Sequence, residues 1–575
     1  MLPLRQSVLT VLLALLLGAY FKGNFINHSP PPNPDSSEHK TERFRCRPFL
    51  PKLLSPNTPI DQHKEIQLAS HRLRSILVDR FSSGDIDSLS VAVVTPGGTL
   101  FEENYGMRRG NESKNSLPTD SHSAYRIASV TKLFTVLEGH ILAQKHIISW
   151  DDPVSKYLPR FKYRNDTISK QHHENSPVTL LQLASHVSGL GRDWPPGDVA
   201  NWPKDIVGAG PPPTNGLPFP SHESLYQSIE ENFLVSPQFS WPVYSNTGIG
   251  LLGMALVAAN RQVNGPKEPN LFSELVQRDI FDKIHMNDSH FLVSGQNKDM
   301  VVVPSLAPEV ASSSKDQDFL DAMNPAAGQF SSLRDSAIFL RSLLSSGTQG
   351  SLLSKTTFNN WIHSAHAFEE DDWTETGFVW EIIKALDSNN RLRRIYWKLG
   401  AMAGYHAAIA IHPGTMYGVS VLLSGHYPDA GKIAYDVFEV FQPHLDTVLA
   451  ELATSLYVGT WVKSDSNTTV AVAIDKGTLY VDRLVLNGTN IFTYFDPFSD
   501  RLALRSTEQL DEFRIDVGIP FYNGKRHMGC YPYWAGLDLW GQRNQAPLNV
   551  IYFSGDAQSR RLHVPSTGFT LERDI

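Results

Sequence analysis

The stretch "YRIASVTKLF", residues 125–134, sets a serine and a lysine three positions apart at the start of an apolar helix. The apolar residues that define this helix recur with the spacing of one helical face: Val130, Leu133, Phe134, Leu137 and Ile141. Ser129 falls at the amino end, where a side-chain oxygen caps free N–H groups. Lys132 shares its face and can reach the Ser129 hydroxyl. The pair is therefore either a helix cap with a surface lysine or a nucleophile with its base.

A serine hydroxyl becomes a nucleophile when a neighbouring base takes its proton. Lysine serves as that base when burial or another cation lowers its pKa. The spacing alone is a weak signal, because "SSSK" at 312–315 repeats it without an amphipathic helix behind it. The surrounding motifs therefore have to decide between the two interpretations.

Four more segments place polar or glycine-containing motifs beside apolar runs. They are "TLLQLASHVSGL" (179–190), "VYSNTGIGLLG" (243–253), "NPAAGQFSSLRD" (324–335) and "WKLGAMAGYHAAIAIHP" (397–413). Together with "RIASVTKLF", and in the same order, they resemble the class C-like branch of the serine β-lactamase and penicillin-binding-protein superfamily. The start of the tail, "LYVGTWV", with the hairpins after it, resembles the appended β domain of fungal secreted β-lactamase-like proteins.

The resemblance implies a role for each matched residue. Ser129 is the acyl-accepting nucleophile, Lys132 takes its proton, and Tyr244 shares the base role and later activates water or an alcohol. Asn246 positions Lys132 and the substrate, and Lys398 helps Lys132 to favour the Tyr244 phenolate. The backbone N–H groups of Ser129 and of Ala401, directly after Gly400, form the oxyanion hole. The resemblance implies no metal and no organic cofactor.

Each role has a structural alternative. Tyr244 is otherwise a core tyrosine, and "YRN" at 163–165 shows that Tyr-x-Asn recurs by accident. Lys398 is otherwise an ordinary strand lysine, and we expect His186 to be structural rather than a catalytic base. The remaining histidines lack metal-ligand spacing with acidic partners, including His172, His173, His363 and His366.

The third motif departs from the family pattern at Leu399, where β-lactamases and D-alanyl peptidases usually carry a hydroxyl residue that binds the substrate's carboxylate. This change predicts a more apolar site and a small-molecule ester, lactone, thioester or amide substrate with a hydrophobic acyl part. Four aromatic residues are candidates to line it: Trp241, Trp380, Trp397 and Tyr405. Hydrolysis, acyl transfer and cyclisation remain open, as do a true β-lactamase or D-alanyl peptidase and a catalytically inactive secreted binding protein. A Gly-x-Ser-x-Gly elbow, which an α/β-hydrolase requires, is not found.

The pattern of elements predicts an α+β fold, an α/β sandwich of the β-lactamase/transpeptidase type. A hairpin at 88–104 and strands between 378 and 425 flank a helical subdomain, and a long helix covers 431–456, so that distant strands share one antiparallel sheet. Residues 55–454 form the predicted catalytic domain. Residues 455–575 alternate at period two around Lys-Gly and Asn-Gly turns up to "NIFTYFD", and predict a small all-β domain. In that domain the core interpretation is favoured for Trp461, Trp534 and Trp540.

The amino terminus indicates the secretory pathway. Residues 1–25 contain Arg5 followed by one apolar run, which predicts a signal peptide or an uncleaved signal anchor, and 26–54 read as a Pro-rich linker and arm. Six N-x-Ser/Thr sequons predict a secreted glycoprotein: Asn27, Asn111, Asn165, Asn287, Asn467 and Asn487. The two cysteines, Cys46 and Cys530, are either one disulfide or two buried thiols. A membrane partner is expected only if the anchor is retained, and a net charge of −8 argues against nucleic acid.

Overall fold

The computed structural model describes residues 46–574 except 111, 113–115, 165–176, 307–314, 498, 510, 518–521, 524–525, 528 and 540. The predicted signal segment and the sequons at Asn27, Asn111 and Asn165 lie outside these residues. The sequons at Asn287, Asn467 and Asn487 are exposed. Within the described ranges, no helix combines the length and the apolar character needed to cross a membrane.

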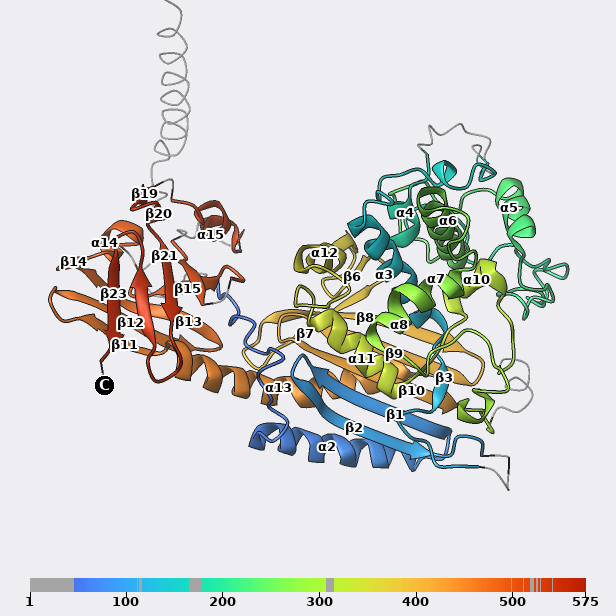
Figure 1. The fold of residues 1–575 in the computed structure, drawn as a ribbon, viewed down its shortest axis with the longest axis horizontal. Coiled ribbons are helices and arrows are strands. Elements are labelled where there is room, and N and C mark those ends of the chain that lie inside the picture. The colour runs from blue at the N-terminus through green and yellow to red at the C-terminus, as the bar shows by residue number, and fades with distance from the viewer. Residues whose placement is uncertain are drawn as a thin grey trace, which may run out of the picture. The chain divides into compact units, whose positions relative to one another are not determined.

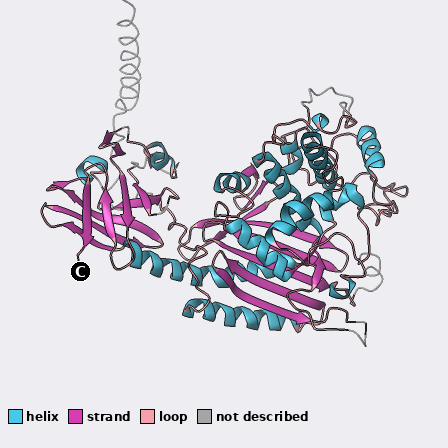
Figure 2. Ribbon diagram, in the orientation of Figure 1, coloured by secondary structure: helices cyan, strands magenta, loops and turns pink. Residues whose placement is uncertain are grey.

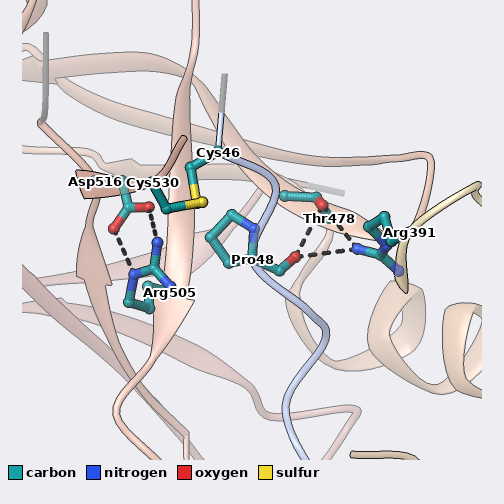
Figure 3. Close-up of a disulfide and its surroundings, with 7 residues drawn as sticks. All are labelled: Cys46, Pro48, Arg391, Thr478, Arg505, Asp516 and Cys530. Carbon is teal, nitrogen blue, oxygen red and sulfur yellow. Dashed lines mark hydrogen bonds and ion pairs between the residues drawn. A yellow bond between two sulfur atoms is a disulfide. The ribbon is translucent and has the colours of Figure 1, made fainter. Parts of the chain in front are cut away.

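Cys46 and Cys530 are joined by a disulfide across a sequence separation of 484 residues, which confirms the predicted bridge (Figure 3). Both belong to one compact unit, and residues Arg47–Ile519 and Tyr533–Ile575 form the other. In the larger unit, the Pro48 carbonyl accepts hydrogen bonds from Thr478 at 2.9 Å and from Arg391 at 3.3 Å (Figure 3). These two bonds fix the start of the described chain.

An eight-stranded antiparallel sheet forms the centre of the predicted catalytic domain, in the order β2-β1-β10-β9-β8-β7-β6-β5 (Figures 1 and 2). Its strands are β1 (Ile86–Thr95), β2 (Gly98–Gly106), β5 (Ser364–Ala367), β6 (Thr374–Gly377), β7 (Glu381–Leu386), β8 (Leu392–Met402), β9 (Tyr405–His412) and β10 (Tyr417–Gly425). The predicted hairpin is β1–β2, and Val91 of β1 pairs with Val421 of β10. Strands from distant parts of the chain therefore share the sheet, as predicted.

The sheet has a separate hydrophobic core on each face. On one face, residues such as Ala408 and Ala410 of β9 pack with α2 (Lys64–Phe81) and α13 (Ala430–Tyr457). On the other face, the intervening Ala407 and Ile409 pack with the helical subdomain. The main helices of that subdomain are α3 (Thr131–Gln144), α6 (Asn246–Asn264), α10 (Leu320–Ala327) and α11 (Leu333–Leu344) (Figure 1). This two-sided packing is the predicted α+β sandwich.

Shorter elements complete the subdomain. They are η1 (Ala128–Val130), η2 (Val154–Lys156), α4 (Leu180–Ala184), α5 (His222–Glu231), α7 (Phe272–Val276), η3 (Gln277–Phe281), α8 (Asp282–Ile284), η4 (Lys298–Met300) and α12 (Lys355–Trp361). The strands β3 (Ala124–Arg126) and β4 (Phe330–Ser332) pair with each other. This pairing matters for the site, because β3 leads directly into the turn that carries Ser129.

After α13 the chain forms a second sheet, in the order β12-β11-β23-β22-β21-β16-β15-β13-β14, which closes on itself because β12 also pairs with β13. Its strands are β11 (Gly459–Lys463), β12 (Thr468–Asp475), β13 (Thr478–Leu486), β14 (Thr489–Asn490), β15 (Leu502–Ser506), β16 (Glu512–Ile515), β21 (Val550–Ser554), β22 (Arg561–Val564) and β23 (Phe569–Arg573). Smaller elements are α14 (Phe492–Phe495), β17 (Tyr522–Asn523), β18 (Arg526–His527), α15 (Tyr531–Ala535), β19 (Gln542–Arg543) and β20 (Ala546–Pro547).

Two expectations for this region are wrong. The segment "IFTYF" was predicted as strand, but Phe492–Phe495 form the helix α14, because the Asn490 side chain accepts a hydrogen bond from the Phe492 N–H and turns the chain there. Trp461 is fully buried in the core as expected, whereas Trp534 is 69% exposed. Trp540 lies outside the described residues.

Candidate active site

Ser129 lies in the single turn η1 that connects β3 to α3, and its side chain is half-buried. The residue before it, Ala128, has a left-handed backbone with φ +47°, which is unusual for a residue with a Cβ. The alternative in which Ser129 is a cap of α3 does not hold, because Val130 occupies the N-cap position and no side chain caps the helix. The Ser129 hydroxyl instead accepts a hydrogen bond from Lys132 Nζ at 3.0 Å.

Lys132 is completely buried, and its amine is surrounded by oxygen atoms. Besides Ser129 Oγ, Nζ donates to Asn246 Oδ1 at 2.6 Å and to the Ala326 carbonyl at 2.8 Å. Burial lowers the pKa of Lys132, and the charge of Lys398 lowers it further. The neutral amine, which a base requires, is therefore more accessible than in a solvated lysine.

Tyr244 sits between the two lysines. Its ring centre is 4.9 Å from Lys132 Nζ and 5.0 Å from Lys398 Nζ, and the Arg192 guanidinium is 4.9 Å away. Burial by itself raises the pKa of Tyr244, but the charges of Lys132 and Lys398 outweigh it and lower the pKa to about 8. A phenol in this position can release its proton close to neutral pH.

Lys398 stays charged because it has a carboxylate partner that sequence analysis did not find. Its Nζ donates to Glu381 Oε1 at 2.5 Å and to the Leu399 carbonyl at 2.9 Å. Burial alone lowers the pKa of Lys398, yet Glu381 outweighs burial and raises it. Glu381 also accepts the Leu399 N–H at 3.1 Å, so it holds the third motif in place.

Gly400 allows β8 to approach the turn that carries Ser129. A Cβ at this position would lie 2.1 Å from the Ile127 carbonyl oxygen and 3.2 Å from the Val130 nitrogen. Any side chain would therefore push the strand away from η1. The next residue, Ala401, is exposed at the end of β8, where its backbone can contribute to an oxyanion hole.

Asn246 opens α6, which Ser245 caps by accepting the Gly248 N–H at 2.8 Å. Its amide has a second partner beside Lys132, because Nδ2 donates to Asp193 Oδ1 at 2.7 Å. Asp193 was missed by sequence analysis, since it lies 53 residues from Asn246 and follows the matched segment without a motif of its own.

His186 supports the loop that carries Tyr244. Its Nδ1 accepts the Ser245 N–H at 3.2 Å, its carbonyl accepts the Val243 N–H at 2.7 Å, and its ring centre is 4.8 Å from that of Tyr244. Burial lowers the pKa of His186 well below its usual value, and the nearby cations act in the same direction. A neutral, buried ring that anchors backbone groups agrees with the structural role expected for it.

Most of the aromatic residues expected at the site lie elsewhere. Trp380 and Tyr405 are core residues, and Trp397 packs with the α13 core on the opposite face of the sheet. Leu399 also faces α13, where its Cδ1 lies 3.1 Å from the Cβ position of Gly431. Side chains alternate along a strand, so the neighbours of Lys398 point away from it.

Trp241 is the exception among the four aromatic candidates. It is 45% exposed three residues before Tyr244, and its ring contacts those of His366 and Phe368 at centroid distances of 5.6 and 5.4 Å. Trp241 is therefore the one of the four that the structure leaves outside a hydrophobic core. Among the described residues, no group of three or more His, Cys, Asp or Glu side chains is placed to hold a metal ion.

The fold and the Ser-Lys-Tyr constellation define a protein of the serine β-lactamase and penicillin-binding-protein class. The family model described as Beta-lactamase matches residues 70–441, and the chain belongs to this family. Beta-lactamase-like protein str6 of Strobilurus tenacellus is 32% identical, over 53% of this chain and 99% of that relative. Beta-lactamase-like protein str5 of the same organism is 35% identical, over 45% of this chain and 91% of the relative.

Solved structures with the same fold are more distant in sequence. The octameric penicillin-binding protein homologue from Pyrococcus abyssi has a TM-score of 0.51 at 19% identity, covering 87% of this chain and 99% of its own. The β-lactamase/D-alanine carboxypeptidase from Yersinia pestis also has a TM-score of 0.51, at 20% identity, covering 65% and 98%. At these identities the likeness establishes the fold.

Proposed function

We propose that the chain is a serine hydrolase or acyltransferase that forms a covalent acyl-Ser129 intermediate from an ester, lactone, thioester or amide. The observation that carries the proposal is the 3.0 Å contact between the Ser129 hydroxyl and the buried amine of Lys132. A nucleophile within hydrogen-bond distance of a desolvated base is the geometry that covalent acyl transfer requires.

In the acylation step, the Ser129 O–H bond breaks, its proton passes to Lys132 Nζ, and Oγ bonds to the acyl carbon. The bond to the leaving group then breaks, and the proton passes through the Lys132 and Tyr244 pair to the departing atom. The oxyanion that forms in between is stabilised by the backbone N–H groups of Ser129 and Ala401.

In the second step, the Tyr244 proton moves to Lys132, and the resulting phenolate accepts the proton of an incoming water or alcohol, whose oxygen bonds to the acyl carbon. The bond between the acyl carbon and Ser129 Oγ then breaks, and Lys132 returns its proton to Oγ. A pKa of about 8 for Tyr244 suits this role, because a base is most effective when its pKa is near the working pH. Water gives hydrolysis, a second substrate gives acyl transfer, and a hydroxyl or amine of the acyl group itself gives cyclisation.

An apolar acyl part is favoured over a β-lactam or a D-alanyl peptide. Leu399 offers no hydroxyl to bind a carboxylate, and because its side chain points away from Lys398 toward α13, it does not line the acyl pocket either. The support for an apolar acyl part is the half-exposed Trp241, which lies three residues before Tyr244 in the sequence and packs with Phe368 and His366. A β-lactamase or D-alanyl peptidase, and an inactive binding protein of the same fold, are the alternatives.

We also propose that the protein is secreted and glycosylated. The apolar leader, the exposed sequons at Asn287, Asn467 and Asn487, and the Cys46–Cys530 disulfide all suit an oxidising compartment. Membrane attachment would require an uncleaved leader, and the acidic net charge of −8 speaks against a nucleic-acid partner.

The test is turnover of p-nitrophenyl esters of increasing acyl length, with a chromogenic cephalosporin as the competing substrate class. Wild type should prefer the longer esters, Ser129→Ala should be inactive, and Ser455→Ala, an exposed serine near the end of α13, should match wild type. Preference for the cephalosporin would favour the β-lactamase alternative. Folded protein that turns over neither class would favour the binding protein.

A further inference from the structure

Of the groups that bind the Lys132 amine, Asn246 is the one whose side-chain amide can lie in either of two orientations. The Ala326 carbonyl can only accept, and so it takes one N–H of Lys132 at 2.8 Å. Asn246 can present either its oxygen or its NH₂ group to Lys132, because an amide carries both a donor and an acceptor. If NH₂ faced the amine, two donors would oppose each other.

Asp193 determines which of the two orientations the Asn246 amide takes. Its ionised carboxylate has no proton to donate, so the Asn246 amide must turn its Nδ2 toward Asp193, at 2.7 Å, and its Oδ1 toward Lys132, at 2.6 Å. The Asp193 side chain is only 8% exposed, and its other charged neighbour is Arg192 at 3.6 Å. A buried carboxylate in this position holds the amide in one orientation.

We infer that Asp193 is a positioning residue, which sets the direction of the Lys132 lone pair through Asn246. A neutral Lys132 has two N–H bonds, and when these go to Asn246 Oδ1 and the Ala326 carbonyl, the lone pair is left for its two hydroxyl partners, Ser129 and Tyr244. Ser129 Oγ, 3.0 Å away, can then donate its proton to this lone pair. This inference rests on the proposed function, since it assigns Asp193 a part in the same acylation step.

Asp193 also acts through its charge. The groups that face Lys132 are Tyr244, Lys398 and Asp193, and the last of these raises the Lys132 pKa against the effect of burial. Removing the charge lowers the Lys132 pKa, so the neutral amine persists to lower pH. The two effects of Asp193 can therefore be separated. The orientation of the Asn246 amide sets the plateau of the acylation rate, and the charge of Asp193 sets the pH at which that rate falls on the acidic side.

The experiment measures the second-order rate constant for phosphonylation of Ser129 by a fluorophosphonate, as a function of pH. Asp193→Leu removes the acceptor and should lower the plateau about 10-fold or more, part of what a general base contributes. Asp193→Asn keeps an acceptor, so its plateau should stay within a few-fold of wild type while its acidic limb moves to lower pH. Asp205→Asn, an exposed aspartate in the 194–216 loop, is the charge-matched control and should behave as wild type.

An exchange of the two side chains separates positioning from simple structural support. In Asp193→Asn/Asn246→Asp, the carboxylate at 246 presents an oxygen to Lys132 in either orientation, and the amide at 193 can donate to it. This double variant should recover the plateau of the labelling rate that is lost in Asp193→Leu. Its acidic limb should lie at higher pH than that of wild type, because the carboxylate charge is now closer to Lys132.

The outcomes distinguish the inference from the proposed function. Two results would overturn the role of Asp193: a folded Asp193→Leu variant with the wild-type plateau, or an Asp193→Asn variant whose acidic limb does not move. If the leucine variant does not fold, the pH profile of Asp193→Asn is sufficient by itself. If wild type itself is not labelled at Ser129, the proposed function fails instead.

Discussion

At the scale of single residues, the two lysines of the site differ because their partners differ. Lys132 meets only neutral oxygen atoms in direct contact, and burial lowers its pKa. Lys398 is as deeply buried but pairs with Glu381, which raises its pKa. One lysine is therefore suited to exchange a proton and the other to remain a cation beside Tyr244.

The cation at position 398 leads to a pH prediction. The charges of Lys132 and Lys398 together lower the Tyr244 pKa to about 8, and Lys398→Gln removes one of them, so the phenolate should form only at higher pH. The acidic limb of ester turnover should shift upward, which a pH profile of p-nitrophenyl ester hydrolysis measures. Lys432→Gln, which alters an exposed lysine on α13, is the control. An unmoved limb in folded Lys398→Gln would show that Tyr244 is not the titrating base.

The sequence predicts the residues that stand in motifs but not those that join the site through folding. Ser129, Lys132, Tyr244, Asn246 and Lys398 were all expected, and the structure brings them together. Glu381 and Asp193 could not be found, because no local pattern links them to the residues they contact. Side chains alternate between the two faces of the sheet along β8, so the sequence already indicated that Trp397 and Leu399 face away from Lys398.

At the scale of elements, the contact between β8 and η1 depends on Gly400. In Gly400→Ala, the new Cβ would lie 2.1 Å from the Ile127 carbonyl, and overpacking of this kind typically costs about 1–3 kcal/mol. We expect a lower melting temperature and a large fall in the labelling rate of Ser129. Gly295→Ala, where a Cβ meets nothing within 4 Å, should change neither. Unchanged labelling in Gly400→Ala would mean that the turn tolerates displacement.

A second prediction for an element concerns the buried acid of α3. Glu138 is completely buried, and burial raises its pKa well above 4.5, with the Asp279 charge acting in the same direction and the charges of Lys145 and Arg278 opposing it. Above pH ~4.5 the unfolded chain ionises Glu138 while the folded chain keeps the proton, so stability falls as pH rises. Glu138→Gln removes this penalty.

The stability gain of Glu138→Gln over wild type should therefore widen between pH 5 and pH 8. Melting temperatures measured across this range test it, with the exposed Glu102→Gln as control. A gain that narrows with rising pH would contradict the assignment of a protonated Glu138.

Elements were predictable wherever one periodicity dominated. The β1–β2 hairpin, the strands β8 to β10 and the helix α13 follow from alternation or helical spacing in the sequence. The short helix α14 does not, because a single hydrogen bond from the Phe492 N–H to the Asn490 side chain overrides an alternating pattern. The alternative of Ser129 as a cap fails for a similar reason, because its hydroxyl accepts a hydrogen bond from the Lys132 side chain.

At the scale of the whole molecule, the disulfide and the site belong to different compact units. Bridges that close long loops typically stabilise by about 2–4 kcal/mol. Cys46→Ser/Cys530→Ser should therefore melt at a lower temperature, as wild type should in the presence of a reductant. The Ser129 labelling rate at 25 °C should be unchanged, since no residue of the site lies in the disulfide unit. Loss of labelling in the folded double variant would contradict this independence.

The central claim is that Ser129 is a nucleophile activated by Lys132, and the most direct measurement is intact-mass analysis with peptide mapping after exposure to a fluorophosphonate. We expect a single adduct on Ser129 in wild type, none in Ser129→Ala, and a strongly slowed adduct in Lys132→Met, with all three proteins folded by circular dichroism. No adduct on folded wild type, an adduct on another residue, or an equal rate in Lys132→Met would contradict the account.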